Sequence, residues 1–122
     1  MKVLIVDDNE NITEVVKDFF ELGNIECKTI NNGVEGLAEI QNSNYDLILL
    51  DIAIPDYSGL DILDELKNKS IKSKNIVLFT ASLFNPEDIE KYSSIGVKEI
   101  CEKPVSLEKL ENIKQKYLFA QN

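Results

Sequence analysis

Three short runs of continuous apolar residues limit what this chain of 122 residues can fold into. They are Val3–Val6, Leu47–Leu50 and Ile76–Phe79. Strands buried on both faces have such runs, whereas strands with one wet face alternate apolar and polar residues. Between the runs lie stretches whose apolar residues have helical spacing. Strands that alternate with helices in this way are typical of a parallel sheet covered by helices on both faces.

The remaining patterns complete an α/β chain of five strands and five helices, which we expect to form one domain over residues 1–122. The strands are expected at residues 2–7, 25–30, 46–51, 75–80 and 97–102, and the first three helices at 10–22, 33–41 and 59–68. The fourth helix begins with Asn85 as cap and Pro86 at its first position and ends at Gly96. The fifth is capped by Ser106 and ends near Leu118.

Helical spacing also predicts which side chains of the first and last helices face the core. On the first helix they are Ile12, Val15, Val16 and Phe19, and on the last they are Leu107, Leu110, Ile113 and Tyr117. Tyr92 has helical spacing from Ile89, which favours a place in the core over the alternative of an exposed partner surface.

The charge of the chain excludes several classes of function. The net charge is −9, all 13 basic residues are lysine, and histidine is absent. Direct nucleic-acid binding needs a basic surface, usually with arginine, so we do not expect it. A chain without histidine also lacks the usual zinc ligands, a Ser-His triad and any phosphohistidine of its own. With no apolar run of about 20 residues and no signal-peptide pattern, we expect a soluble cytoplasmic domain without membrane insertion.

Polar and charged residues follow four of the five expected strands. Asp7 and Asp8 end the first, Asp51 the third, Thr80 the fourth and Lys103 the fifth. Ligands of open α/β sheets bind beyond the carboxyl ends of the strands, so these side chains should meet at one edge.

Each of these residues has an ordinary alternative role. Asp8 or Asn9 could simply cap the following helix, Asp51 could be a turn residue, and a lone lysine is usually a solvated charge. Taken together they indicate chemistry, because crowded carboxylates stay ionised only beside a cation. Few hard oxygen ligands suit Mg²⁺, and Mg²⁺ with a lysine and a hydroxyl suits a phosphoryl group.

Four motifs make the sequence similar to the receiver domains of two-component response regulators, including their single-domain chemotaxis members. They are VLIVDDNE at 3–10, DLILLDIAIPDYSGLDIL at 46–63, IVLFTA at 76–81 and EKP at 102–104. The resemblance implies a doubly wound, flavodoxin-like three-layer sandwich with strand order 2-1-3-4-5. That order would place Cys27 and Cys101 on opposite edge strands, too far apart for a disulfide.

The resemblance also assigns roles to the residues at the edge of the sheet. Asp51 would accept the phosphoryl group, while Asp7, Asp8 and the backbone carbonyl of Ala53 would join Asp51 in holding Mg²⁺. Thr80 would donate its hydroxyl to the phosphoryl group, and it would also act as a switch residue.

Further positions match the family's motif. Lys103 would pair with a phosphoryl oxygen, and the bond between Lys103 and Pro104 is usually cis in this family. Gly59 matches the glycine that opens the third helix, and Ala81 matches a small residue that leaves room for phosphate.

The implied function is a phosphorylation-dependent switch. It would take its phosphoryl group from a histidine kinase or phosphotransfer protein and alter a surface that binds an unspecified target. It would not be a conventional enzyme, but it would catalyse its own phosphorylation and dephosphorylation at Asp51. Ile100 departs from the family, because it occupies the switch position where an aromatic residue is usual. The alternative is therefore a receiver that no longer switches and serves as a docking module.

Two unrelated functions share features with this pattern. A flavodoxin-like electron carrier would need a phosphate-binding loop after the first strand, but residues 7–10 are acidic or amide side chains that would repel a phosphate. A haloacid-dehalogenase-type phosphatase would need a second Asp two residues after Asp51, where this chain has Ala53.

Overall fold

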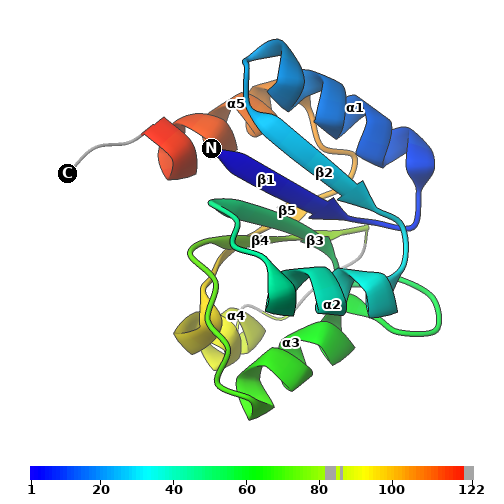
Figure 1. The fold of residues 1–122 in the computed structure, drawn as a ribbon, viewed down its shortest axis with the longest axis vertical. Helices are drawn as coiled ribbons and strands as arrows, with labels where there is room; N and C mark the ends of the chain where they lie inside the picture. The colour runs from blue at the N-terminus through cyan, green and yellow to red at the C-terminus, as the bar shows by residue number, and fades with distance from the viewer. Residues whose placement is uncertain (82–84, 86, 120–122) are drawn as a thin grey trace.

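The computed structural model describes residues 1–81, 85 and 87–119 and shows five parallel strands in one sheet. The order is β2-β1-β3-β4-β5, as the resemblance implies, and Figure 1 shows β1 beside β2. The strands are β1 (Lys2–Val6), β2 (Glu26–Ile30), β3 (Leu47–Asp51), β4 (Ile76–Thr80) and β5 (Val97–Glu102).

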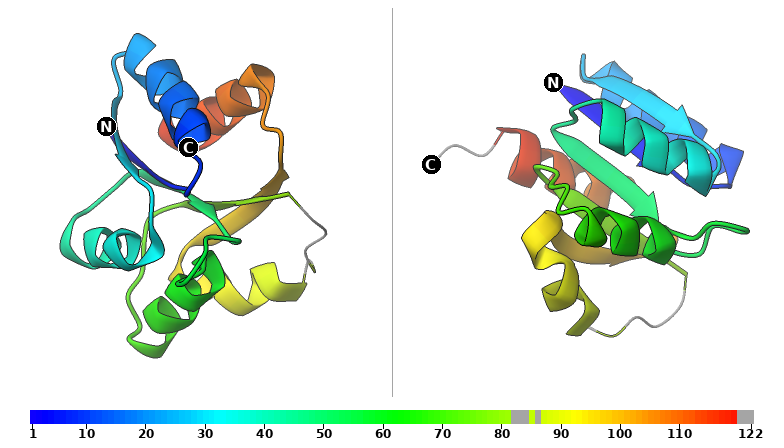
Figure 2. Two further views of the ribbon diagram at one scale, coloured as in Figure 1. Left: turned by 90° about the vertical axis from the view of Figure 1, so that its right-hand side faces the viewer. Right: turned by 60° about the horizontal axis from the view of Figure 1, so that its bottom comes forward.

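Helices cover both faces of the sheet and make three layers. Figure 2 shows α1 and α5 on one face and α2, α3 and α4 on the other. The helices are α1 (Glu10–Leu22), α2 (Gly33–Asn42), α3 (Gly59–Asn68), α4 (Glu87–Tyr92) with a 3-10 turn η1 (Ser93–Ile95), and α5 (Leu107–Lys114) with a π-helical end η2 (Gln115–Phe119). Within the described ranges, no helix is long and apolar enough to cross a membrane.

The three apolar runs form the centre of the sheet. Every residue of β3 and β4 is buried, and so are the last four residues of β1. Alternate side chains enter two separate cores: Leu4 and Val6 face α2, α3 and α4, whereas Val3 and Ile5 face α1 and α5. Tyr92 is buried in the first of these cores, which confirms its expected place.

Two predicted core side chains lie outside instead. Val15 is 54% exposed, because α1 turns a stripe of Thr13, Val16 and Phe20 toward the sheet. Leu107 is 63% exposed, because it is the first residue of α5 and only the later turns of that helix are buried.

The start of the fourth helix is only partly described. Its described part begins at Glu87, two residues after the predicted cap Asn85, and Pro86 lies outside the described residues. The segment changes to a 3-10 turn at Ser93 and ends before Gly96, whose φ of 112° is in the left-handed region that favours glycine.

The two cysteines lie on opposite edge strands of the sheet. Cys27 is on β2 and Cys101 on β5, and both are buried free thiols. Burial raises the pKa of both thiols, that of Cys27 to about 12. They are therefore small core residues, as expected.

Candidate functional site

The carboxyl ends of four strands bring the predicted site residues to one edge of the sheet. Asp51 and Thr80 are the last residues of β3 and β4, and Asp7 directly follows β1. Lys103 directly follows β5, and its N–H donates to the carbonyl of Thr80 at 2.7 Å. Hydrogen bonding between neighbouring parallel strands thus continues one residue past the strand end. It fixes the backbone positions from which these side chains project.

One lysine bridges two buried aspartates at this edge. Lys103 Nζ lies 2.7 Å from Asp7 Oδ2 and 3.3 Å from Asp51 Oδ2. The side chain of Lys103 is 16% exposed, while those of Asp7 and Asp51 are 0% and 5% exposed. Because water screens these charges poorly, their interactions are stronger than those of surface pairs.

The two aspartates are oriented in the same way. Asp7 Oδ1 accepts the N–H of Asn9 at 2.9 Å, and Asp51 Oδ1 accepts the N–H of Ala53 at 3.0 Å. In each case the acceptor lies two residues before the donor, which is the geometry of an Asx-turn. Each carboxylate is thus held through one oxygen and presents the other to Lys103.

A third carboxylate completes what we call the rim cluster: Asp7, Asp8, Asp51 and Lys103. One carboxylate oxygen from each of the three aspartates lies within 4.8 Å of the others. Asp8 is exposed, and it is not the cap of α1, because Asn9 Oδ1 accepts the N–H groups of Asn11 and Ile12. The cap is therefore Asn9, and the Asp8 side chain stays available at the rim.

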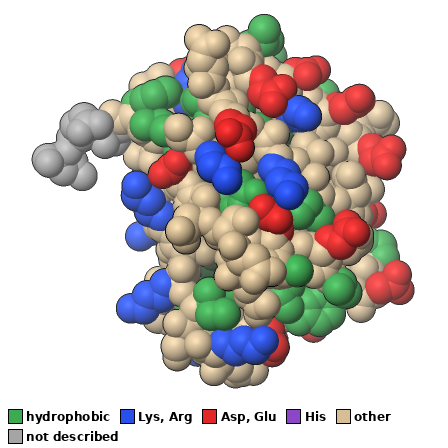
Figure 3. All heavy atoms as spheres, viewed as in Figure 1, with side chains coloured by type: hydrophobic (Ala, Val, Ile, Leu, Met, Phe, Trp, Pro, Cys, Tyr) green, Lys and Arg blue, Asp and Glu red, His purple; other side chains and the backbone are tan. Residues whose placement is uncertain are grey.

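The electrostatics of the rim cluster show an excess of negative charge. Burial raises the pKa of the Asp7 carboxyl, and the charge of Asp51 raises it further against the opposing effect of Lys103. Burial alone would lower the pKa of the Lys103 ammonium, but the hydrogen bonds and charges of Asp7 and Asp51 together outweigh it, so that pKa is raised. Figure 3 shows further acidic side chains on the side toward which β1 and β2 point.

A divalent cation fits this donor set. Three carboxylates share a single ammonium, and carboxylate oxygens are the ligands that Mg²⁺ prefers. Ala53 follows Asp51 by two residues and contacts its carboxylate through the backbone, so it lies beside the cluster. The structure therefore brings the three predicted metal-ligating aspartates together, with Ala53 next to them.

The other predicted residues lie on α3, β4 and β5 or directly after these strands. Thr80 is buried at the end of β4, and Ala81 is the exposed residue after it. A Cβ atom on Gly59 would lie 2.3 Å from the carbonyl oxygen of Asp51, so α3 can start this close to Asp51 only with glycine. The bond between Lys103 and Pro104 is cis, as the resemblance implies. Ile100 is half-buried and packs against the core that faces α4.

Asn31, which the sequence motifs did not indicate, also lies at this edge. It is the first residue after β2, and its Nδ2 donates to the carbonyl of Asp7 at 2.9 Å. The rule that selected the residues after the other strands would have found it, had it been applied to β2 as well.

An apolar groove of about 280 Å³ adjoins Lys103. It runs between the start of α1 and the connection from β5 to α5. Val15 and Val105, an exposed and a partly buried side chain, both line it. Its full lining is Asn11, Ile12, Val15, Val16, Lys103, Pro104, Val105 and Leu110.

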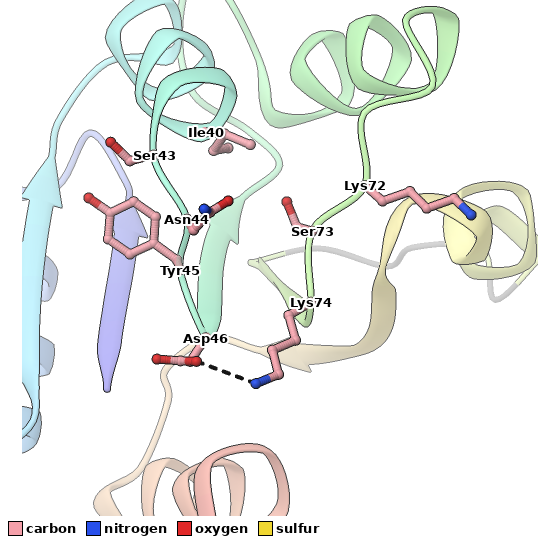
Figure 4. Close-up of a pocket in the computed structure, with 8 residues that line it drawn as sticks. All are labelled: Ile40, Ser43, Asn44, Tyr45, Asp46, Lys72, Ser73 and Lys74. Carbon is pink, nitrogen blue, oxygen red and sulfur yellow. Dashed lines mark hydrogen bonds and ion pairs between the residues drawn. The ribbon is translucent and has the colours of Figure 1, made fainter.

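A second hollow, of about 260 Å³, lies at the opposite end of the sheet (Figure 4). It is formed by the residues before β3 and β4. Asp46 accepts the N–H of Lys2 at 2.8 Å and pairs with Lys74 at 3.5 Å, while Lys72 extends away from the other lining residues. Asp46 is paired with Lys74, so this hollow does not gather unpaired carboxylates as the rim cluster does.

Comparisons with known proteins agree with one another. A family model described as the response regulator receiver domain matches residues 3–115. The probable C4-dicarboxylate response regulator DctR of Bacillus subtilis is 31% identical over 118 residues, which is 95% of this chain and 51% of that protein. Hybrid signal transduction histidine kinase G of Dictyostelium discoideum is 35% identical over 96% of this chain and 4% of its own length. The chain thus spans about half the length, or less, of these curated relatives.

Solved structures match over almost the whole chain. The response regulator TrrA of Thermotoga maritima, in complex with Mg²⁺ and BeF, is 32% identical with a TM-score of 0.79 and covers 96% of this chain and 98% of its own. Chemotaxis protein CheY4 of Vibrio cholerae is 28% identical with a TM-score of 0.80, again over 96% and 98%.

Proposed function

Because this chain belongs to the receiver domains of two-component response regulators, we propose that it is a signalling switch whose phosphoacceptor is Asp51. The observation that carries the proposal is the orientation of Asp51. One carboxylate oxygen is held by the N–H of Ala53, and the other lies beside Lys103 and two further carboxylates. This is the arrangement that a nucleophilic carboxylate needs in order to receive a phosphoryl group.

The donor is a phosphohistidine on another protein, since this chain has no histidine. An oxygen of the Asp51 carboxylate attacks the phosphorus, the bond from phosphorus to the histidine nitrogen breaks, and an acyl phosphate forms. Lys103 holds a phosphoryl oxygen with its ammonium, and Thr80 donates its hydroxyl to another. Water later attacks the same phosphorus, which releases inorganic phosphate and restores the Asp51 carboxylate.

Asp7, Asp8, Asp51 and the carbonyl of Ala53 would hold Mg²⁺. When bound, the ion neutralises part of the charge on the phosphoryl oxygens. Mg²⁺ fits this site because three carboxylates share the single ammonium of Lys103. The Thermotoga relative, which was solved with Mg²⁺ and BeF, supports the assignment.

The apolar groove beside Lys103 supports docking of the protein that carries the phosphohistidine. A donor must bring its histidine to Asp51, and the groove begins at the lysine that pairs with Asp51. Val15 would give such a partner an apolar contact on α1, since its side chain is already exposed.

The test is phosphorylation by acetyl phosphate with Mg²⁺, followed by intact mass spectrometry. The wild-type chain should gain the mass of one phosphate, and Asp51→Asn should not. Asp56→Asn is a matched control, because Asp56 lies in the loop after β3 but has no place in the rim cluster. Full labelling of Asp51→Asn would refute the assignment.

A second candidate is a receiver that docks without switching, and Ile100 is the observation that favours it. A half-buried isoleucine packed against the core cannot make the rotation of an aromatic side chain. NMR spectra with beryllofluoride separate the two. Shift changes that extend from the rim to α4 and β5 support a switch, while changes confined to the rim support docking alone.

A further inference from the structure

We propose that Asn31 is a positioning residue for the metal site: its side-chain amide fixes the peptide unit that joins Asp7 to Asp8. Asn31 Nδ2 donates to the carbonyl oxygen of Asp7 at 2.9 Å. That carbonyl belongs to the peptide bond between Asp7 and Asp8, so its direction sets how the two carboxylates are placed relative to each other. The inference rests on the proposed function, since it concerns how the cation site is held.

The backbone explains why a side chain is needed at this point. The N–H of Asp7 donates to the carbonyl of Ile30 at 3.0 Å, which extends the ladder from β1 to β2 by one step. The register of β1 with β2 ends at Val6 and Ile30, and the next carbonyl, that of Asp7, accepts a hydrogen bond from the Asn31 amide. The amide thus continues the pairing of β1 with β2 up to the first metal-ligating residue.

A second hydrogen bond fixes the orientation of the amide. Asn31 Nδ2 also donates to Thr13 Oγ1 at 3.2 Å, and Thr13 Oγ1 in turn donates to the carbonyl of Glu10 at 3.1 Å. Thr13 is a buried residue of α1. Both hydrogens of the amide and the single hydroxyl hydrogen are therefore used, and the chain of bonds joins the ends of β1 and β2 to the first turn of α1.

Asn31→Ala should therefore weaken Mg²⁺ binding, because residues that support metal ligands typically contribute 10–100-fold to affinity. We expect the dissociation constant for Mg²⁺ to rise about tenfold. The chain has no tryptophan to report binding, so the titration is followed by NMR through the amide signals of Asp7, Asp8 and Ala53. At saturating Mg²⁺ the rate of labelling by acetyl phosphate should return to within about threefold of wild type.

Asn32→Ala is the matched control, because Asn32 is the neighbouring residue but has a different task. Its Oδ1 accepts the N–H of Glu35 at 2.8 Å and caps α2. This variant should lower the melting temperature and leave Mg²⁺ affinity within about twofold of wild type. A purely structural role for Asn31 would make the two variants behave alike.

A pair of variants at Thr13 tests the same inference independently, even if Asn31→Ala does not fold. Thr13→Val removes one acceptor of the Asn31 amide and should raise the dissociation constant for Mg²⁺ about threefold. Thr13→Ser keeps the hydroxyl and should bind Mg²⁺ with the affinity of wild type. The inference is overturned if Asn31→Ala binds Mg²⁺ as tightly as wild type does; if that variant does not fold, Thr13→Val takes its place. It is also overturned if Mg²⁺ binding by Asn32→Ala is weakened as much as binding by Asn31→Ala. Failure of the wild-type chain itself to bind Mg²⁺ would instead refute the proposed function.

Discussion

Two groups of lysines and carboxylates include a residue on β5 or directly after it, and they are built in opposite ways. In the rim cluster, three aspartates share one lysine. In what we call the Glu99 cluster, the carboxylate of one glutamate on β5 interacts with two lysine side chains and with the hydroxyl of a tyrosine. Lys109 Nζ and Lys116 Nζ lie 3.1 and 3.0 Å from the two Glu99 oxygens, and the Tyr117 hydroxyl donates to Glu99.

The pKa of the central carboxyl follows this difference. Burial alone would raise the pKa of Glu99, but the hydrogen bonds from Tyr117, Lys116 and Lys109 outweigh it and hold the pKa below its usual value. At Asp7 burial prevails and the pKa is raised. A carboxylate whose partners suffice stabilises the fold, whereas one whose partners are too few is suited to bind a further cation.

The largest expected effect comes from removing the single cation of the rim cluster. Lys103→Met should slow labelling of Asp51 by acetyl phosphate by about 100–1000-fold, because a preorganised charge beside the phosphoryl group is lost. Lys109→Met removes a lysine from the Glu99 cluster and should leave that rate within about twofold. The rates are measured by intact mass against time, and similar losses in both variants would erase the contrast between the clusters.

Binding of Mg²⁺ should stabilise the protein through the rim cluster only. At a free Mg²⁺ concentration ten times the dissociation constant, the gain is about 1.4 kcal/mol. For a chain of this length that corresponds to a rise in melting temperature of about 5 °C, which EDTA should reverse. The rise should vanish in Asp7→Asn and persist in Glu99→Gln. A rise of equal size in Asp7→Asn would mean that Mg²⁺ binds elsewhere.

Glu99→Gln should lower the free energy of unfolding at neutral pH by about 1 kcal/mol. The figure is modest because the Lys109 and Lys116 side chains are 43% and 64% exposed, and water screens them. Labelling of Asp51 should be unaffected. Urea unfolding monitored by circular dichroism gives the stability, and a variant as stable as wild type would show that the Glu99 cluster does not support α5.

The stabilisation by Glu99 should depend on pH with a definite sign. Its folded pKa lies below the ordinary 4.5, so the ionised form is favoured by folding. The advantage of wild type over Glu99→Gln is fully present above pH 4.5 and is lost as the pH falls through the folded pKa. An advantage that grew on acidification would contradict the direction of this shift.

The sequence predicted the rim cluster well because its position depends on few variables. Apolar runs locate the strands, each candidate residue lies at or directly after a strand end, and the carboxyl ends of parallel strands share an edge. Errors of one residue at strand boundaries did not matter, as Asp7 shows: it was assigned to the first strand and lies directly after it.

The Glu99 cluster could not be predicted in this way. Glu99 meets Lys116 across 17 positions and Tyr117 across 18, through the packing of α5 and its π-helical end against β5. The rotation of a helix about its axis decides such contacts, and spacing alone predicted that rotation poorly. Val15 was wrongly expected to be buried for the same reason.

The smallest predicted effect is that of Lys116→Met, and it bears on whether Glu99 really has more partners than it needs. Lys116 has a 64% exposed side chain, and Glu99 keeps Lys109 and Tyr117 without it. The loss in unfolding free energy should be at most about 0.5 kcal/mol. It should disappear at about 1 M salt, where the Debye length falls to about 3 Å. A larger, salt-independent loss in unfolding free energy would mean that Glu99 requires all three partners. The Glu99 cluster would then have no more cationic and hydrogen-bonding partners than the carboxylate needs.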